Sequence, residues 1–177
     1  MPSPQKQKGS SWERVCAIKL TDIYGETFIR VPGSGAYVGG MNASRKEILH
    51  EGIIRVMKGD IVPPPHFKKF NAECKSYADF PFHQLYTGDC KTLDGWLLQA
   101  LDAADEGDFT VLFMKFNRKG TFIVFNRDHL KSFNLGNHTV YNSTQTGSWI
   151  IADLETFFTE PSNVVSFKSL SQGTELA

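Results

Sequence analysis

Residues 69–75 contain the pattern that most constrains how this chain can fold. Apolar and polar residues alternate there, in the order Phe70, Asn71, Ala72, Glu73, Cys74 and Lys75. A period of two is typical of a β-strand with one apolar face. The other face then carries a carboxylate and an amine side by side. Because burying an unpaired charge is costly, Glu73 and Lys75 form either a salt bridge or a functional site.

The segments around this strand predict that helices and strands alternate. We expect helices from Ser10 or Ser11 to Gly25, over 44–57 and over 92–107. We expect strands over 27–31, 59–62, 69–75, 109–116 and 121–125, and a strand that runs into a short closing helix over 148–158. Two hairpins are expected, one joining 59–62 to 69–75 and one within 109–125. This order predicts an α/β fold with a mixed sheet.

The two ends of the chain are expected to lie outside the folded domain. Residues 1–9 are polar and basic and contain two prolines, which predicts a flexible basic arm. Residues 10–168 would form a single domain, and 169–177 a disordered tail. Within the domain, the polar stretch 134–147 is expected to be an extended excursion.

Composition excludes some classes of function. Lys and Arg total 19, as do Asp and Glu, so the net charge neither requires nor excludes a nucleic-acid partner. The three cysteines form no CxxC pair, which favours a reducing compartment. The five histidines lack HxxxH and HExxH spacing, so a zinc site has no support. Without a signal-like or membrane-spanning stretch, we expect a soluble cytoplasmic protein with no membrane partner, in the host cytoplasm if a phage encodes it.

Glu73, Lys75 and Asp60 together point to phosphodiester cleavage. Such hydrolysis needs a divalent metal held by carboxylates, and a group that orients or activates water. An antiparallel neighbour would deliver Asp60 beside Glu73 and Lys75. The same spacing arises by chance at Asp89 and Lys91, which lack a strand context. The alternative is an ordinary surface ion pair, which contributes about 0–1 kcal/mol.

Four short motifs follow one another along the chain: KGSSWER (8–14), RVPGSGA (30–36), GD (59–60) and AECKS (72–76). Together they resemble the successive motifs of PD-(D/E)xK nucleases, specifically the archaeal-type Holliday-junction resolvases and their phage-encoded relatives. The resemblance covers residues 8–125 and implies a restriction-endonuclease-like core, a mixed β-sheet flanked by helices. The chain departs from the short resolvases by an inserted helix over 44–57, a C-terminal extension, and Gly59 in place of proline before Asp60.

The resemblance also implies roles for individual residues. Asp60, Glu73 and the Cys74 carbonyl would bind Mg²⁺, for which Mn²⁺ can substitute. Glu13 would approach the metal through a water, and Lys75 would position or polarise the attacking water. Further residues would lie near the DNA, namely Ser34 by the scissile phosphate, Gln99 beside the active site, and Arg14 and Arg30 on phosphates.

Three basic residues add DNA-binding candidates from the sequence itself. Lys8 belongs to a basic cluster, and Arg118 and Lys119 occupy a hairpin tip where they would clamp the DNA backbone or remain solvated. Other candidates also have structural alternatives. Glu13 could favour the helix dipole, Ser34 could be a turn residue, Gln99 a satisfied core amide, and Arg30 a surface charge.

These features predict a Mg²⁺-dependent DNA endonuclease that resolves four-way Holliday junctions in recombination or repair. Resolvases cut two opposed strands, so the resemblance implies a symmetric homodimer. The apolar 109–125 hairpin would supply its interface or be plain core. Three alternatives stay open: a nuclease of the same fold cutting duplex DNA in restriction, homing or repair, a non-catalytic DNA-binding module, and a structural or interaction protein.

Overall fold

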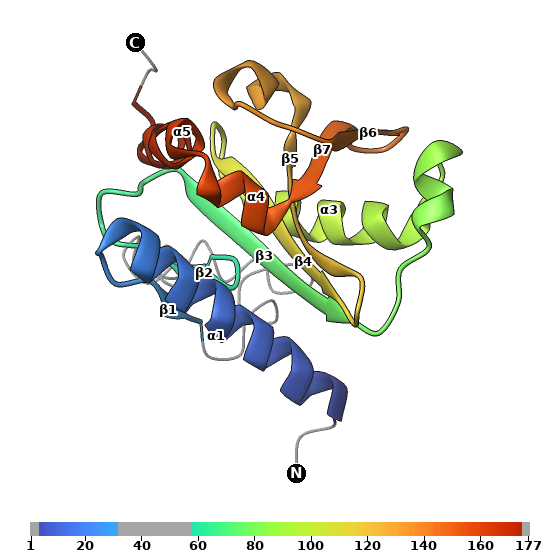
Figure 1. Cartoon of the computed structure of the whole chain (residues 1–177), viewed down its shortest axis with the longest axis horizontal. Coiled ribbons are helices and arrows are strands. Elements are labelled where there is room, and N and C mark those ends of the chain that lie inside the picture. The colour runs from blue at the N-terminus through green and yellow to red at the C-terminus, as the bar shows by residue number, and fades with distance from the viewer. Residues whose placement is uncertain (1–3, 32–57, 175–177) are drawn as a thin grey trace.

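A five-stranded mixed sheet forms the centre of the protein in the computed structural model, which describes residues 4–31 and 58–174 (Figure 1). Its strands are, in spatial order, β3 (Phe70–Tyr77), β4 (Phe109–Phe116), β5 (Gly120–Asn126), β7 (Gly147–Asp153) and β6 (His138–Ser143). β3 and β4 are parallel, and the other neighbouring strands are antiparallel. Two short strands, β1 (Ile29–Arg30) and β2 (Ile61–Val62), form a separate antiparallel sheet.

Helices cover both faces of the sheet (Figure 1). One face is covered by α1 (Pro4–Tyr24), α4 (Leu154–Thr159) and α5 (Pro161–Gln172), and the other by α3 (Lys91–Ala103) and the 3-10 helix η2 (Phe82–Tyr86). A second 3-10 helix, η3 (Arg127–Ser132), follows β5. A hydrophobic cluster fills the space on each side. The predicted α/β fold, a mixed sheet flanked by helices, is confirmed.

The helix α3 connects β3 to its parallel neighbour β4, and this crossover covers one face of β3. Leu93, Trp96, Leu97 and Ala100 recur at helical spacing and are all buried against the sheet. Near the end of α3, the Ala100 carbonyl accepts the Asn71 side-chain amide at 2.9 Å. The opposite face of β3, with Ala72 and Cys74, belongs to the cluster that includes α1.

The predicted hairpin between 59–62 and 69–75 is wrong. β2 pairs with β1, not with β3. The prolines 63–65 lack the N–H groups that a continuing ladder requires, so the chain leaves the sheet there. Asp60 nevertheless lies along the outer edge of β3, since its backbone N–H donates to the Ala72 carbonyl at 2.8 Å.

Both predicted chain ends differ from the structure. Helix α1 begins at Pro4, so residues 4–9 of the predicted arm are helical, and proline is tolerated in a first turn. Helix α5 extends to Gln172 and ends at Gly173, whose φ of 73° is left-handed. The predicted tail is therefore wrong up to that residue. The Ser171 carbonyl accepts the N–H of Lys69 at 2.8 Å, which ties α5 to the start of β3.

The stretch 134–147, predicted as an excursion, contains the edge strand β6. Tyr141 and Ser143 are buried and Asn142 between them is exposed, but polar residues on this edge obscure the alternation. The C-terminal extension thus completes the sheet. α3 ends at Ala103 rather than at 107, and Leu101, expected to face inward, is 40% exposed. The predicted inserted helix lies outside the described residues.

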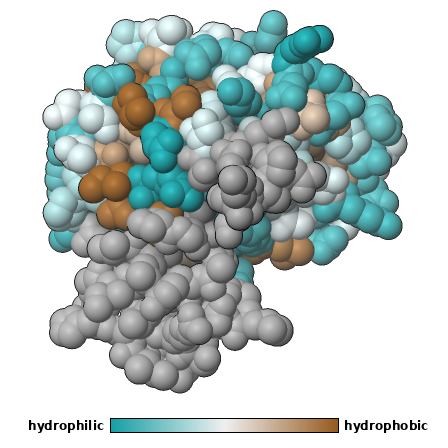
Figure 2. All heavy atoms as spheres, turned by 90° about the horizontal axis from the view of Figure 1, so that it is seen from below, coloured by the Kyte–Doolittle hydropathy of each residue, from teal (hydrophilic) through white to brown (hydrophobic). Residues whose placement is uncertain are grey.

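The predicted hairpin within 109–125 is confirmed as β4 and β5. Most of its apolar side chains, such as Phe113 and Ile123, are buried in the core and are not available for a dimer interface, while Phe122 is partly buried. Exposed apolar side chains lie elsewhere, and they include Val15 and Ile18 of α1 and Ile29 of β1. Seen from below, hydrophobic side chains form small groups among hydrophilic ones (Figure 2). Within 4–31 and 58–174, no helix is long and apolar enough to cross a membrane.

Candidate active site

Glu73, Lys75 and Gln99 form a closed ring of hydrogen bonds between β3 and α3. The Lys75 Nζ donates to the Glu73 Oε1 and to the Gln99 Oε1, each at 2.7 Å. The Gln99 Nε2 donates to the same Glu73 Oε1, also at 2.7 Å. Glu73 is 3% exposed, so the pair is not a solvated surface ion pair. The ring leaves the second carboxylate oxygen of Glu73 outside these three contacts.

Gln99 reaches the pair because α3 lies across the polar face of β3. Residues 73 and 75 point to one face of the strand, and α3 brings residue 99 above both. Gln99 is itself exposed and bonds to charged side chains. It is therefore not the core amide that was its structural alternative.

Asp60 is fixed at the outer edge of β3. Its Oδ2 accepts the backbone N–H of Cys74 at 2.7 Å, and its residue is 3% exposed. In a strand, the N–H and C=O of one residue point to the same edge, so the Cys74 carbonyl is directed to the side where Asp60 lies. The predicted proximity of Asp60 and Glu73 thus arises through an edge contact rather than a hairpin.

Gly59 makes this approach possible. Its φ is 64°, in the left-handed region that favours glycine. A Cβ at this position would lie 2.5 Å from the Ala72 carbonyl oxygen. The GD motif therefore has a steric reason for its glycine, which its replacement of proline in the sequence does not reveal.

The electrostatics of the cluster are dominated by buried negative charge. Burial, followed by the negative charge of Asp60, raises the pKa of Glu73 to about 7, although the Lys75 ammonium acts to lower it. Glu13 makes a smaller contribution in the same direction as Asp60. A bound cation would relieve this repulsion because it favours the ionised carboxylates.

The oxygen donors fit a hard divalent cation such as Mg²⁺. The Asp60 carboxylate lies at the β3 edge and its charge acts on the Glu73 carboxylate, and the Cys74 carbonyl is directed to the same edge. In the part of the chain described here, no group of three or more His, Cys, Asp and Glu side chains could hold a metal ion. A cation here would therefore depend on the carbonyl and on water, a mode that Mg²⁺ commonly adopts.

Glu13 and Arg30 form a second ion pair near the cluster. The Arg30 Nε donates to the Glu13 Oε2, and Glu13 is 8% exposed. Because α1 begins at Pro4, Glu13 lies well beyond the first turn, so the helix-dipole alternative does not apply. Arg30 is held by an acid and is not the solvated strand-end charge of its alternative.

The remaining candidates are more scattered. Arg14 is exposed on α1, and Arg118 occupies the β4–β5 turn with a φ of 59°. Lys119, in the same turn, pairs with Asp79 at 2.5 Å. The Lys8 side chain and Ser34 lie outside what the structure describes.

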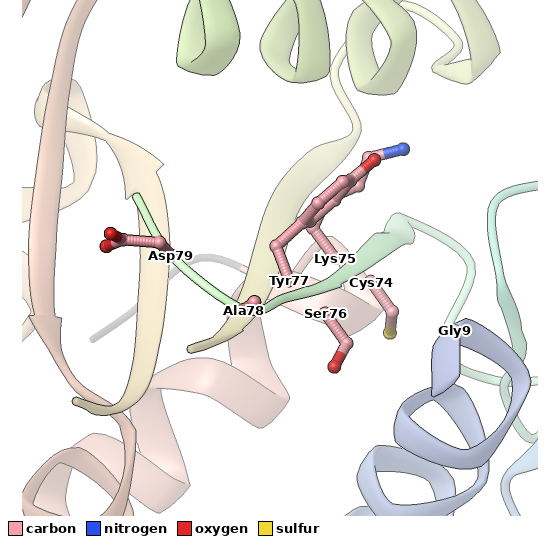
Figure 3. A pocket seen from close by; sticks show the side chains of 7 residues that line it. All are labelled: Gly9, Cys74, Lys75, Ser76, Tyr77, Ala78 and Asp79. Atoms are coloured by element: carbon pink, nitrogen blue, oxygen red, sulfur yellow. The ribbon is translucent and has the colours of Figure 1, made fainter. Parts of the chain in front are cut away.

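A cavity of about 430 Å³ opens at the carboxyl end of β3, beside α1 (Figure 3). It is lined by Gly9, Cys74, Lys75, Ser76, Tyr77, Ala78 and Asp79. Its volume lies in the range of ligand pockets. Lys75 connects the cavity to the carboxylate cluster. Tyr77 is not among the residues predicted from sequence. Its only sequence signal is its position two residues after Lys75 on the same strand.

Comparison with protein families gives one match. The model described as "Phage putative PDDEXK endonuclease" matches residues 4–166, which is most of the chain and includes every candidate site residue. Neither the curated proteins nor the solved structures compared with the chain gave a match.

Proposed function

The chain belongs to the phage PDDEXK endonuclease family, and from this we propose that it is a Mg²⁺-dependent DNA endonuclease whose site is built on Asp60, Glu73 and Lys75. The family lies within the PD-(D/E)xK superfamily, with which the mixed sheet and its helices are consistent as a restriction-endonuclease-like core. PD-(D/E)xK nucleases generally use a divalent metal.

The observation that carries the proposal is the convergence of two buried carboxylates and one lysine at the β3 edge. Glu73 and Lys75 match the E-x-K half of the superfamily motif, and Asp60 supplies its preceding acid. Asp60 is distant from Glu73 in sequence, but its hydrogen bond with the Cys74 N–H places it next to the residue that follows Glu73. A non-catalytic module would have no need to bury this much negative charge.

Each residue has a role that follows from its contacts. Asp60, Glu73 and the Cys74 carbonyl would hold the ion, which when bound stabilises charge on the phosphate and lowers the pKa of a water. Lys75 would hold the attacking water in line with the phosphorus, and Gln99 would keep Lys75 in place. Glu13 would contact the metal-bound water, as its smaller effect on Glu73 suggests.

Basic residues around the cluster would hold the DNA backbone. Arg14 is exposed on the helix that flanks the cavity, and Arg30 could exchange Glu13 for a phosphate. Lys8, Arg118 and Lys119 would extend the contact, and Ser34 would approach the scissile phosphate. Removing any one of these arginines or lysines would lower the salt dependence of DNA binding.

We further propose that the substrate is branched DNA and that the protein acts as a homodimer. The support is the order of the four motifs, which resembles junction resolvases, and the need to cut two opposed strands. The alternative substrate within this fold is duplex DNA.

The test is cleavage of a labelled four-way junction and a linear duplex of equal sequence, each with Mg²⁺ or with EDTA, by the wild type and by Glu73→Ala. Paired nicks near the crossover that need both Mg²⁺ and Glu73 would support the whole proposal. Equal cutting of both DNAs would keep the nuclease and remove the branched substrate. If neither the wild type nor Glu73→Ala cuts DNA but both still bind it, the proposed nuclease function is wrong and a non-catalytic DNA-binding module is supported.

A further inference from the structure

Tyr77 is an exposed aromatic residue at the edge of the active-site cavity, and the proposed chemistry does not use it. It is the last residue of β3, is 49% exposed, and lines the same cavity as Lys75. Most aromatic rings of this chain are instead buried in the two core clusters. A half-exposed ring beside a charged site offers a surface for a flat ligand.

Tyr77 and Lys75 face the same way. They are two residues apart on one strand, so their side chains project from the same face, as Figure 3 shows, with Ser76 on the other side. Their Cα atoms are separated by about 6.6 Å, at 3.3 Å per residue. Stacked DNA rises about 3.4 Å per nucleotide, so Tyr77 would lie within two nucleotides of a phosphate held at Lys75.

The ring of Tyr77 is held in a fixed orientation by α3. It stacks on Trp96 with ring centroids 5.0 Å apart and an interplanar angle of 24°. Trp96 is 8% exposed and also stacks on Phe80, so it forms a rigid base. Trp96 lies three residues before Gln99 on the same helix face, so α3 orients both the ring and the catalytic lysine. Trp96 stacks on one face of the Tyr77 ring, and Tyr77 remains 49% exposed where it lines the cavity at the end of β3.

We propose that Tyr77 stacks on a DNA base next to the cleaved phosphate, and that the cavity accepts a base that has left its own stack. This inference rests on the proposed nuclease function. Every base has a π-face, so such a contact tolerates any sequence. It instead selects DNA in which a base can leave the helix at low cost, as at the crossover of a branched DNA. Tyr77 would therefore determine substrate selectivity rather than contribute to the chemical step.

The test is a double-mutant cycle in which the tyrosine ring and the DNA base that it would contact are removed singly and together. The cut is first mapped with Mg²⁺ on the preferred DNA. Single abasic residues are then placed at each position within two nucleotides of the cut. Dissociation constants are measured by fluorescence anisotropy with Ca²⁺ in place of Mg²⁺, for the wild type and for Tyr77→Leu. Thermal unfolding of each variant checks that the fold is retained.

We expect Tyr77→Leu to weaken binding of the intact DNA by roughly 5- to 150-fold, the range of about 1–3 kcal/mol measured for base–aromatic stacking. At one position, an abasic residue should weaken binding by the wild type as much as Tyr77→Leu weakens binding of the intact DNA. On that abasic DNA, Tyr77→Leu should cause no further loss. Tyr77→Phe, which keeps the ring, should bind within threefold of the wild type. Tyr86→Leu, which removes an 84% exposed tyrosine outside this cavity, should change nothing.

The outcomes separate this inference from the function on which it rests. If the wild type cuts DNA but Tyr77→Leu binds as tightly as the wild type, the stacking site is wrong and the nuclease stands. Equal weakening by Tyr77→Leu at every abasic position would also overturn the stacking site, because no single base would then be its partner. If no DNA is cut under any condition, the nuclease function and the stacking site fall together.

Discussion

The Asp60 carboxylate accepts the backbone N–H of Cys74 at 2.7 Å, which joins the segment before β2 to the outer edge of β3. Cys74 directly follows Glu73, so this one hydrogen bond brings two acids from separate segments to the same strand edge. A charge-assisted bond to a backbone amide also restricts the carboxylate to one position. The site therefore depends on how closely the loop can approach β3.

Gly59 is the residue that permits this approach, and it has a matched control in Gly25. Both have a left-handed φ, 64° at Gly59 and 65° at Gly25. A Cβ added at Gly59 would lie 2.5 Å from the Ala72 carbonyl oxygen, whereas a Cβ added at Gly25 would have no atom within 4 Å. We expect Gly25→Ala to lower the free energy of unfolding by about 1–2 kcal/mol from backbone strain alone. Gly59→Ala should lower it by about 1–3 kcal/mol more and greatly reduce cleavage. Urea unfolding and a cleavage assay on the same preparations measure both, and equal destabilisation by the two substitutions would contradict the steric role.

Gln99 should affect cleavage without affecting stability. Its amide contacts both Lys75 and Glu73 but the residue is exposed, so Gln99→Met removes two hydrogen bonds and little buried surface. We expect cleavage to fall about 10–100-fold, as is typical when a residue that orients a metal ligand is lost. Gln145→Met, which changes an exposed glutamine in the β6–β7 turn, is the control. A Gln99→Met enzyme that cuts within twofold of the wild type would show that the ring of hydrogen bonds is not needed.

The raised pKa of Glu73 predicts that metal binding depends on pH. Burial and Asp60 raise this pKa from 4.5 to about 7. Between these values the unfolded chain has lost the proton and the folded chain still holds it. The contribution of Glu73 to stability therefore falls as pH rises from about 4.5 to about 7, and is constant above that. A cation must displace the proton, so its binding releases protons below pH 7.

We expect the dissociation constant of Ca²⁺, measured by calorimetry, to increase about tenfold for each pH unit below 7. In EDTA at pH 8, Glu73→Gln should be at least as resistant to thermal unfolding as the wild type, since a buried charge has been removed. The same pH dependence in Glu73→Gln as in the wild type would assign the proton to another group.

The core of the site could be predicted from sequence because its signal is local. The alternation around Glu73 and Lys75 identifies the strand, and their spacing places both side chains on one face. The apolar periodicity after the strand predicts the helix, and the family resemblance, not this periodicity, implies that Gln99 on that helix lies beside the site. The parallel pairing of β3 and β4 then follows from the helix between them.

The parts that could not be predicted depend on contacts between distant segments. The pairing of strands depends on tertiary contacts. The sequence around residue 61 therefore does not indicate that β2 pairs with β1. From the sequence alone, the polar face of β3 cannot be distinguished from a solvent-exposed face. In the structure, α3 covers this face. The role of Gly59 requires knowing that its loop contacts Ala72. The polar sequence of β6 conceals a strand because its outward residues lie at a sheet edge.

The most direct test of the central claim, that Lys75 and its acids form a DNA-cleaving centre, is the single-turnover cleavage rate of Lys75→Met with saturating enzyme and Mg²⁺. Lys115→Met is the matched control, because this exposed lysine lies on the neighbouring strand β4 with its amine 5.5 Å from the centroid of the Trp12 ring. We predict that Lys75→Met lowers the rate by about 10²- to 10⁴-fold, the usual range for a group that handles the attacking water. Lys115→Met should remain within threefold of the wild type. A Lys75→Met enzyme that cuts at the wild-type rate would contradict the account.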